Sequence, residues 1–211
     1  MGSAGQIGLV EQIFDWFREE NTLIMVDPVM GDGGKLYKTY TPEMASGMAR
    51  LCGRADIVVP NMTEAHHLLE REYDPGPYTR QQIEGILKGL CALGPRMAVL
   101  TGVWLKEGSL GTACYDAATG EAELYLTDRI EGFYHGTGDL FASALLGGLL
   151  NGMSLNAACE TATEFTWRTI ETTHEKCADH RFGPKFECHL PWLGEKMEAC
   201  RKTIANPADL R

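Results

Sequence analysis

The sequence predicts an α/β fold, in which a mostly parallel β-sheet is covered by helices on both faces. Three observations favour this class. Short β-branched stretches alternate with longer stretches of helical periodicity along the 211 residues. Strands end at polar residues beside proline, as in Asp27-Pro28 and Pro60-Asn61. Many of the 24 glycines stand at the ends of apolar stretches, which is typical of tight loops.

The helices are predicted from apolar spacing and from their start signals. Pro42 suits the first position of a helix, and Thr63 and Thr79 are expected to cap the next two. Helices are predicted over residues 7–20, 42–52, 64–70, 80–93, 137–151 and 154–173, with a last one after Pro191.

The strands are predicted from β-branched composition and alternation. Strands are predicted over residues 22–26, 56–59 and 96–101, and a hairpin over 111–115 and 121–127. Because ligands of parallel sheets bind at the carboxyl ends of the strands, we expect Asp27, Asn61 and Thr101 to share one edge. The whole chain, residues 1–211, is interpreted as one domain.

Composition excludes several classes of protein. The formal net charge is −10 and no long basic run occurs, so we expect no nucleic-acid partner. No apolar stretch reaches membrane-spanning length, and the first residues lack a signal pattern, so we expect no membrane segment. The seven cysteines are scattered singly and are interpreted as reduced thiols of a cytoplasmic protein.

A candidate anion site lies in His135-Gly136-Thr137-Gly138-Asp139, directly before an Ala/Leu-rich helix. Gly136 and Gly138 permit a tight turn around Thr137, and the first N–H groups of the helix suit a phosphate. A carboxylate beside a phosphate is repelled by it, so the presence of Asp139 at this position needs an explanation. It is either a base that deprotonates an attacking hydroxyl or a cap of the helix.

Two further stretches follow predicted strands. Asp27 precedes a glycine-rich loop with Asp32 and Lys35, which suits magnesium and phosphates or is a solvated turn. Asn61 and Glu64 are three residues apart at a helix start, so both side chains can face the sheet edge. They suit Mg²⁺ or its waters, although Glu64 alone also complements the helix dipole.

Taken together, these strings resemble a known family. Asp-Pro-Val-Met-Gly-Asp from residue 27, Pro-Asn-x-x-Glu-Ala from residue 60, Leu100-Thr101-Gly102 and Gly-Thr-Gly-Asp from residue 136 occur in order. They resemble the vitamin-kinase branch of the ribokinase-like superfamily, and pyridoxal (pyridoxine, pyridoxamine) kinases most of all. The resemblance extends from Gly2 to about Thr173.

The resemblance implies a ribokinase-like α/β/α sandwich and transfer of the ATP γ-phosphate to the hydroxymethyl group of a B6 vitamer, with Mg²⁺. Asp139 would be the base, and Gly136, Thr137 and Gly138 the anion hole. Asp27 and Glu64 would support the metal, with Asn61 beside them, and Thr101 and Gly102 would lie near the nucleotide.

The start of the chain departs from this family, whose members begin with further strands that build much of the vitamin pocket. Met1-Gly2-Ser3 resembles an internal segment of the family, so we expect a partial kinase domain that lacks the N-terminal strands. Such a chain is expected to self-associate and to phosphorylate pyridoxal poorly, whereas a full-length chain is expected to form a homodimer.

Two alternatives remain open at this stage. A hydroxymethylpyrimidine kinase of thiamine synthesis shares the Asp-Pro-Val-Met string, but those relatives often carry cysteine where Asp139 stands. A non-catalytic nucleotide-binding fragment would explain the missing strands.

Overall fold

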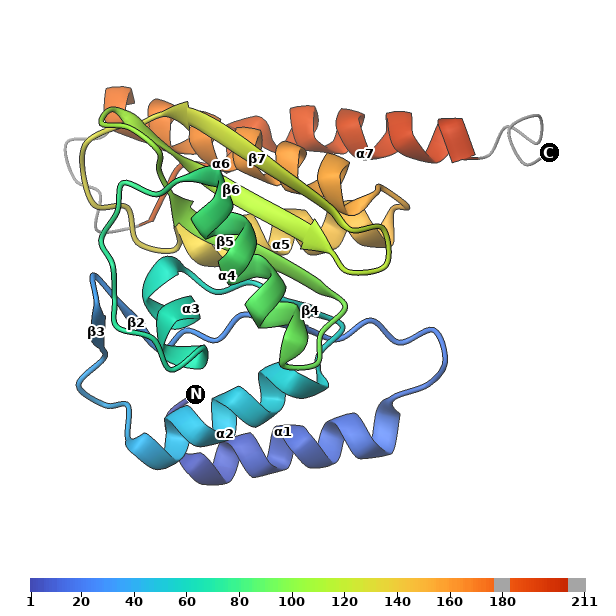
Figure 1. The fold of residues 1–211 in the computed structure, drawn as a ribbon. Coiled ribbons are helices and arrows are strands. Elements are labelled where there is room, and N and C mark those ends of the chain that lie inside the picture. The colour runs from blue at the N-terminus through green and yellow to red at the C-terminus, as the bar shows by residue number, and fades with distance from the viewer. Residues whose placement is uncertain (177–182, 205–211) are drawn as a thin grey trace. The chain divides into compact units, whose positions relative to one another are not determined.

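The computed structural model describes residues 1–176 and 183–204, the side chains of 202–204 excepted (Figure 1). The chain divides into two compact units. The first comprises Met1–Glu107 and Ala113–Ala122, and the second comprises Gly108–Thr112 and Glu123–Arg211. The interpretation of residues 1–211 as one domain therefore stays a prediction.

Five strands form one sheet in the order β1-β4-β5-β6-β7. Their bounds are β1 Met25–Val26, β4 Ile57–Val58, β5 Met97–Val103, β6 Ser109–Asp116 and β7 Glu121–Asp128. The strands β1 and β5 both pair in parallel with β4, and β6 and β7 form the predicted hairpin. Helices flank this sheet, so the predicted α/β class with a mostly parallel sheet is confirmed.

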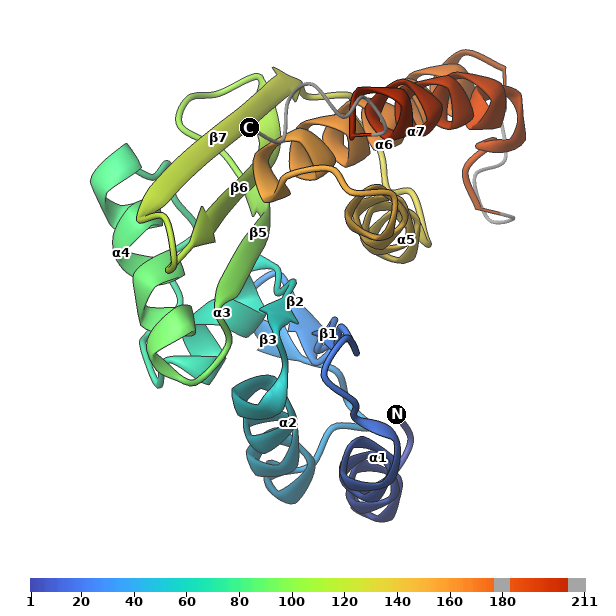
Figure 2. The same ribbon diagram turned by 90° about the vertical axis from the view of Figure 1, so that its right-hand side faces the viewer.

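Four helices belong to the first unit: α1 Ala4–Phe17, α2 Pro42–Arg54, α3 Met62–Leu68 and α4 Arg80–Ala92. The helices α1 and α2 lie side by side (Figure 2). Ile7 of α1 is buried, and a Cβ added at Gly47 of α2 would meet its side chain at 3.0 Å. The missing Cβ thus lets these two helices pack closely. The other two helices, α3 and α4, pack on β5.

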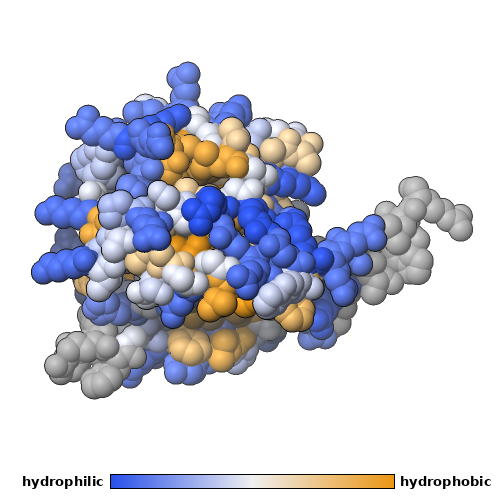
Figure 3. All heavy atoms as spheres, turned by 90° about the horizontal axis from the view of Figure 1, so that it is seen from below, coloured by the Kyte–Doolittle hydropathy of each residue, from blue (hydrophilic) through white to orange (hydrophobic). Residues whose placement is uncertain are grey.

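The outward face of α1 is apolar but exposed to solvent. Leu9 and Ile13 are about half exposed, and Trp16 and Phe17 are 69% and 68% exposed. Figure 3 looks onto the side on which α1 and α2 lie, where apolar side chains interrupt the polar surface. Amphipathic surface helices normally place polar residues on this face, so the pattern is unusual.

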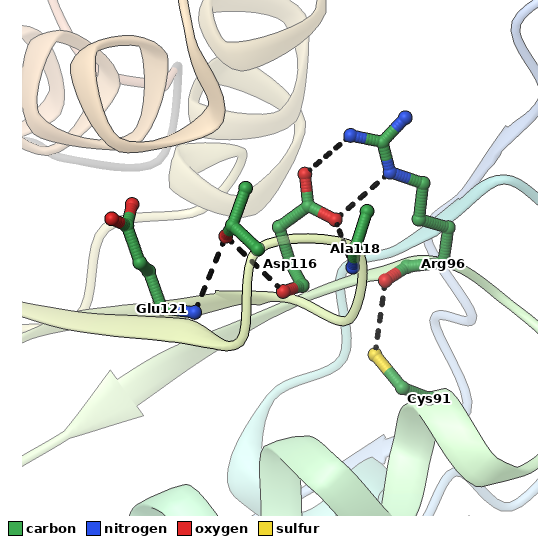
Figure 4. Close-up of polar contacts among 6 residues, drawn as sticks. Cys91, Arg96, Asp116, Ala118 and Glu121 are labelled. Carbon is green, nitrogen blue, oxygen red and sulfur yellow. Dashed lines mark hydrogen bonds and ion pairs between the residues drawn. The ribbon is translucent and has the colours of Figure 1, made fainter.

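A bidentate ion pair holds the turn between β6 and β7 against the start of β5 (Figure 4). Arg96 donates from Nε and Nη2 to the carboxylate of Asp116, at 2.8 and 2.6 Å. The same carboxylate accepts from the N–H of Ala118 at 2.9 Å, inside the turn. Cys91 at the end of α4 donates its thiol to the Arg96 carbonyl at 3.4 Å, so helix, strand and turn are joined.

The helices of the second unit are α5 Thr137–Leu150, α6 Leu155–Lys176 and α7 Leu190–Ile204, with a short 3-10 helix over Glu187–His189. The helices α5 and α6 approach closely, because a Cβ at Gly148 would meet that of Ala158 at 3.1 Å. Buried hydroxyls join β6 to α6: Thr112 Oγ1 lies 2.6 Å from Thr163 Oγ1. The predicted helices after residues 136 and 154 and near Pro191 are confirmed.

One local prediction was wrong, and one pair of strands was not predicted. Thr63 does not cap α3; Asn61 does. The glycine-rich loop after Asp27 contains a hairpin of two short strands, β2 Gly31–Asp32 and β3 Lys35–Leu36. Gly33 and Gly34 form its turn at φ 57° and 78°, a conformation that favours glycine.

None of the six described cysteines forms a disulfide, and Cys177 lies outside the described residues. The interpretation of the cysteines as reduced thiols of a cytoplasmic protein stays a prediction. Over the described part of the chain, no helix has both the length and the apolar character that a membrane span requires.

Candidate active site

The first unit brings together three of the predicted site residues at the carboxyl ends of its parallel strands. Asp27 directly follows β1, and Asn61 and Thr101 form an isolated parallel bridge beyond the paired parts of β4 and β5. The Thr101 N–H donates to the Pro60 carbonyl at 3.0 Å, which continues the strand pairing up to this point. The predicted shared edge is therefore present in the structure.

The Glu64 carboxylate accepts three hydrogen bonds at this edge, although the residue is only 2% exposed. Its Oε1 accepts from the N–H groups of Met30 and Gly31 at 2.7 and 3.4 Å, and Oε2 accepts from the Asn61 N–H at 2.9 Å. Burial, aided by the charge of Asp27, raises the pKa of Glu64 to about 7 against the opposing effect of these donors. A buried carboxyl thus depends on backbone N–H groups for its stabilisation.

Asn61 uses both ends of its amide. Oδ1 accepts from the Glu64 N–H at 3.0 Å, and Nδ2 donates to the Gly31 carbonyl at 2.8 Å. Together with the bond from the Asn61 N–H to Glu64, this forms a reciprocal capping box at the start of α3. Glu64 therefore stabilises the start of α3, which is the structural role that the sequence left open as an alternative.

The fit of a divalent cation at this edge follows from the carboxyl groups present. Asp27 and Glu64 interact electrostatically, and a cation between like charges relieves their repulsion. Glu64 Oε1 already accepts two bonds and Oε2 accepts one, so only Oε2 has capacity left for a water on the cation. Among the described residues no third histidine, cysteine or acidic residue completes a cluster of three. Two carboxyl groups would leave most coordination positions of a cation to waters, which Mg²⁺ tolerates. Binding of Mg²⁺ at this edge stays a prediction.

Thr101 and Gly102, predicted to lie near the nucleotide, stand on β5. Thr101 is half-buried, whereas Gly102 is exposed at φ 72°. A Cβ added at Gly102 would meet nothing within 4 Å, so the backbone here is open to close approach. Their contact with a nucleotide stays a prediction.

The second unit carries the predicted anion site at the start of α5. Gly136 is the N-cap at φ 85° and provides no capping side chain. Since Asp139 is the third helical residue and not the cap, the capping alternative is wrong. A Cβ added at Gly138 would meet nothing within 4 Å, which leaves open space beside the first helical N–H groups. These groups and the helix dipole fit a phosphate.

Two side chains complete the description of this site. Thr137 Oγ1 donates to the Tyr134 carbonyl at 3.1 Å, so its hydroxyl fixes the turn that precedes α5. Asp139 is exposed, and no hydrogen bond to another described residue engages its carboxylate. It is therefore accessible as a proton acceptor.

Some contributors were missed from the sequence. The N–H groups of Met30 and Gly31 face one carboxylate, and Val29 before them has φ 41°. Thr63 Oγ1 accepts from the Gly34 N–H at 2.9 Å, which joins the β2–β3 turn to α3. The backbone conformation of Val29 could not be predicted from its residue type. The glycines at 31, 33 and 34, by contrast, indicate a tight turn in the sequence.

Comparison with known proteins shows to which family this chain belongs. The sequence profile described as phosphomethylpyrimidine kinase matches residues 1–185. The pyridoxine/pyridoxal/pyridoxamine kinase of Bordetella avium is 29% identical over 182 residues, which cover 82% of this chain and 58% of that protein. The thiamine biosynthetic bifunctional enzyme TH1 of Arabidopsis thaliana is 26% identical over 187 residues, which cover 89% of this chain and 35% of that protein.

Solved structures agree with this assignment. A candidate phosphomethylpyrimidine kinase from Bacteroides thetaiotaomicron superposes with a TM-score of 0.88 at 32% identity, over 92% of this chain and 67% of that one. Pyridoxal kinase from Lactobacillus plantarum superposes with a TM-score of 0.81 at 29% identity, over 94% of this chain and 69% of that one.

The chain spans roughly half the length of the first curated relatives, between 35% and 58%. The profile nevertheless matches most of its residues, and the fold agrees along nearly all of them. The chain therefore belongs to the phosphomethylpyrimidine kinase and pyridoxal kinase family, a family of kinases with the ribokinase-like fold.

Proposed function

We propose that this chain serves the ATP-dependent phosphorylation of the hydroxymethyl group of a B6 vitamer, pyridoxal, pyridoxine or pyridoxamine. The observation that carries this proposal is the start of α5, where Gly136 leaves the first N–H groups without a side-chain cap and Asp139 is exposed beside them. A phosphate site with an accessible carboxylate is what transfer to an alcohol requires.

Each candidate residue has a definite task in this reaction. The N–H groups that follow Gly136 hold phosphate oxygens, and Gly138 leaves room for them to approach. Asp139 accepts the proton of the vitamer hydroxyl as that oxygen bonds to phosphorus. Mg²⁺, when bound, neutralises phosphate charge, and Asp27 with Glu64 would hold it and its waters. Thr101 and Gly102 would contact the nucleotide.

The substrate class is supported by the relatives. The Bordetella avium protein is named as a kinase of all three vitamers, and the Bacteroides thetaiotaomicron protein, 32% identical, was solved with pyridoxal. Pyridoxal kinase from Bacillus subtilis, 26% identical, was solved as an ADP complex, which supports ATP as the phosphate donor. We further propose a homodimer in the cytoplasm for the full-length protein.

A second candidate function is phosphorylation of hydroxymethylpyrimidine in thiamine synthesis. The family description and the Arabidopsis thaliana relative favour it. Asp139 favours the B6 vitamers, because hydroxymethylpyrimidine kinases often carry cysteine at this position. The third possibility, a fragment that binds nucleotide without catalysis, predicts ADP affinity without turnover.

The test is ADP release with pyridoxal, pyridoxine, pyridoxamine and hydroxymethylpyrimidine as separate acceptors. The 211-residue chain is compared with a chain extended upstream where the genome continues the open reading frame. Faster release with a B6 vitamer than with the pyrimidine supports the proposal. Preference for the pyrimidine by both chains contradicts it, and ADP binding without release from either chain favours the fragment.

A further inference from the structure

The turn that precedes α5, residues 135–138, has few side chains of its own to hold it. Two of its four residues are glycines, which lose the most conformational freedom when a chain is ordered. Thr137 fixes the turn from inside, through its bond to the Tyr134 carbonyl at 3.1 Å. Backbone N–H groups bind an anion well when they are already in place, because ordering a flexible turn costs free energy. Contacts from outside the turn therefore matter for phosphate binding.

The first such contact joins Tyr134, directly before the turn, to the end of α6. The Tyr134 ring folds back over Gly132, where an added Cβ would meet the ring at 2.9 Å. The hydroxyl donates to the Glu131 carbonyl at 3.0 Å and lies 2.8 Å from Nδ1 of His174. Because the hydroxyl has one hydrogen and a carbonyl only accepts, Nδ1 of His174 is the donor in the second bond.

The second contact comes from residues 183–185, which follow α6 in the chain. A Cβ added at Gly136 would meet Pro184 Cδ at 4.0 Å, and one added at Gly183 would meet the His135 carbonyl oxygen at 3.8 Å. Both are ordinary van der Waals distances, so this segment lies directly against the turn.

Thr173 fastens the same segment to α6. This threonine is fully buried, at 0% exposure. Its Oγ1 accepts from the Lys185 N–H at 2.8 Å and donates to the Thr169 carbonyl at 2.6 Å. A buried hydroxyl that donates and accepts at the same time has a fixed direction. Since His174 directly follows Thr173, both contacts on the turn start from one end of α6.

We infer that Tyr134, Thr173 and His174 are positioning residues of the phosphate site: through them the end of α6 holds the turn before α5 in its binding conformation. The phosphate belongs to the proposed function, so this inference rests on it. It goes further by giving a role to α6 and to residues 183–185, where no site residue was predicted.

The test uses the 211-residue chain and two readouts that do not involve turnover. Hydrogen exchange of the Leu140 amide, which donates to the Gly136 carbonyl at 3.0 Å, is followed by NMR and reports on the turn. Titration with Mg²⁺ and a non-hydrolysable ATP analogue reports on phosphate binding. Tyr134→Phe keeps the ring and removes the hydroxyl. It should speed Leu140 exchange and weaken analogue binding, each by roughly 3–10-fold, as the loss of ordinary hydrogen bonds does.

Variants of His174 separate positioning from a general loss of stability. His174→Asn keeps an N–H donor where Nδ1 lies and should behave as the wild type, whereas His174→Ala should weaken analogue binding. The double variant Tyr134→Phe/His174→Ala should be no weaker than Tyr134→Phe alone, because both changes remove the same bond. Additive losses, or a His174→Asn chain as weak as His174→Ala, would overturn the inference.

Variants of Thr173 test the second contact. Thr173→Val keeps the shape of the side chain and removes the acceptor of the Lys185 N–H. Exchange of the Lys185 amide should rise by roughly tenfold or more, and analogue binding should weaken with it. Thr173→Ser keeps the hydroxyl and should retain both wild-type values. Fast Lys185 exchange at unchanged analogue affinity would contradict a role of residues 183–185.

The matched control is Tyr115→Phe, which removes a half-buried tyrosine hydroxyl from β6 in the other unit and should change neither readout. Faster Leu140 exchange in Tyr134→Phe at unchanged analogue affinity would overturn the inference, since the turn would then be held without effect on phosphate. A wild type that binds no analogue would contradict both the inference and the proposed function. Absence of vitamer turnover together with all the expected exchange and binding effects would contradict the proposed function alone.

Discussion

Asn61 and Glu64 bond to each other reciprocally, the N–H of each to the side chain of the other, at 2.9 and 3.0 Å. This pair starts α3 and buries a carboxyl group at the edge of the sheet where the candidate cation site lies. Its protonation state therefore affects both the stability of the first unit and the site.

Stability should depend on pH through Glu64. Its pKa is raised from 4.5 to about 7 in the folded chain, so between these values the native state binds more protons than the unfolded state. Its contribution is fully present below pH 4.5 and is lost as the pH rises to about 7, by up to about 3 kcal/mol. Urea unfolding at pH 5 and pH 8 should show this loss in the wild type relative to Glu64→Gln. A constant difference between the two proteins would contradict it.

Removing the carboxylate of Asp139 should slow catalysis with little effect on folding. Asp139→Asn should lower kcat by roughly 10²–10⁴-fold, which is typical of a general base, in whichever chain releases ADP with a vitamer. The KM for ATP should change little. Glu160→Gln, an exposed carboxyl on α6, is the control in steady-state assays. Near-normal turnover of Asp139→Asn would remove the base assignment.

Adding a methyl group at Gly138 should raise the stability of α5 and weaken phosphate binding. The position is helical and a Cβ there meets nothing within 4 Å, so Gly138→Ala should stabilise α5 by up to about 1 kcal/mol. The same methyl would occupy the space that a phosphate needs near the first N–H groups. Thermal unfolding and titration with a non-hydrolysable ATP analogue should show an unchanged or higher Tm together with weaker binding of the analogue. Unaltered affinity for the analogue would place the γ-phosphate elsewhere.

The exposed face of α1 should make the chain self-associate. Its acidic residues Glu11 and Asp15 pair with Arg50 and Arg54 of α2, so charge does not oppose contact between two copies at this helix. Trp16→Lys should shift the chain toward monomer in analytical ultracentrifugation, because it puts a charge into an apolar contact.

The control for this prediction is Leu150→Lys, which charges a side chain 67% exposed at the end of α5. That variant should associate as the wild type does. A monomeric wild type at all concentrations, or equal behaviour of both variants, would contradict a role of α1 in association.

The sequence by itself determined the fold class, most elements and the family. Periodicity separates helices from strands, and the local cap at Thr79 can be predicted because its partner Gln82 is three residues away. The meeting of Asn61 with Thr101 was also predictable, since parallel strands present their carboxyl ends at one edge. The roles of Asp27, Glu64 and Asp139 in catalysis stay predictions.

Only the tertiary structure decided which donors meet which acceptors. Thr63 was predicted as a cap, but its hydroxyl accepts from Gly34, 29 residues earlier, and Asn61 caps α3 instead. The Glu64 carboxylate likewise accepts from the N–H of Met30, 34 residues earlier, directly after Val29 with its φ of 41°. Such pairings depend on the path of the whole chain, because a buried polar group accepts the partner that folding brings within reach, and no local pattern encodes that partner.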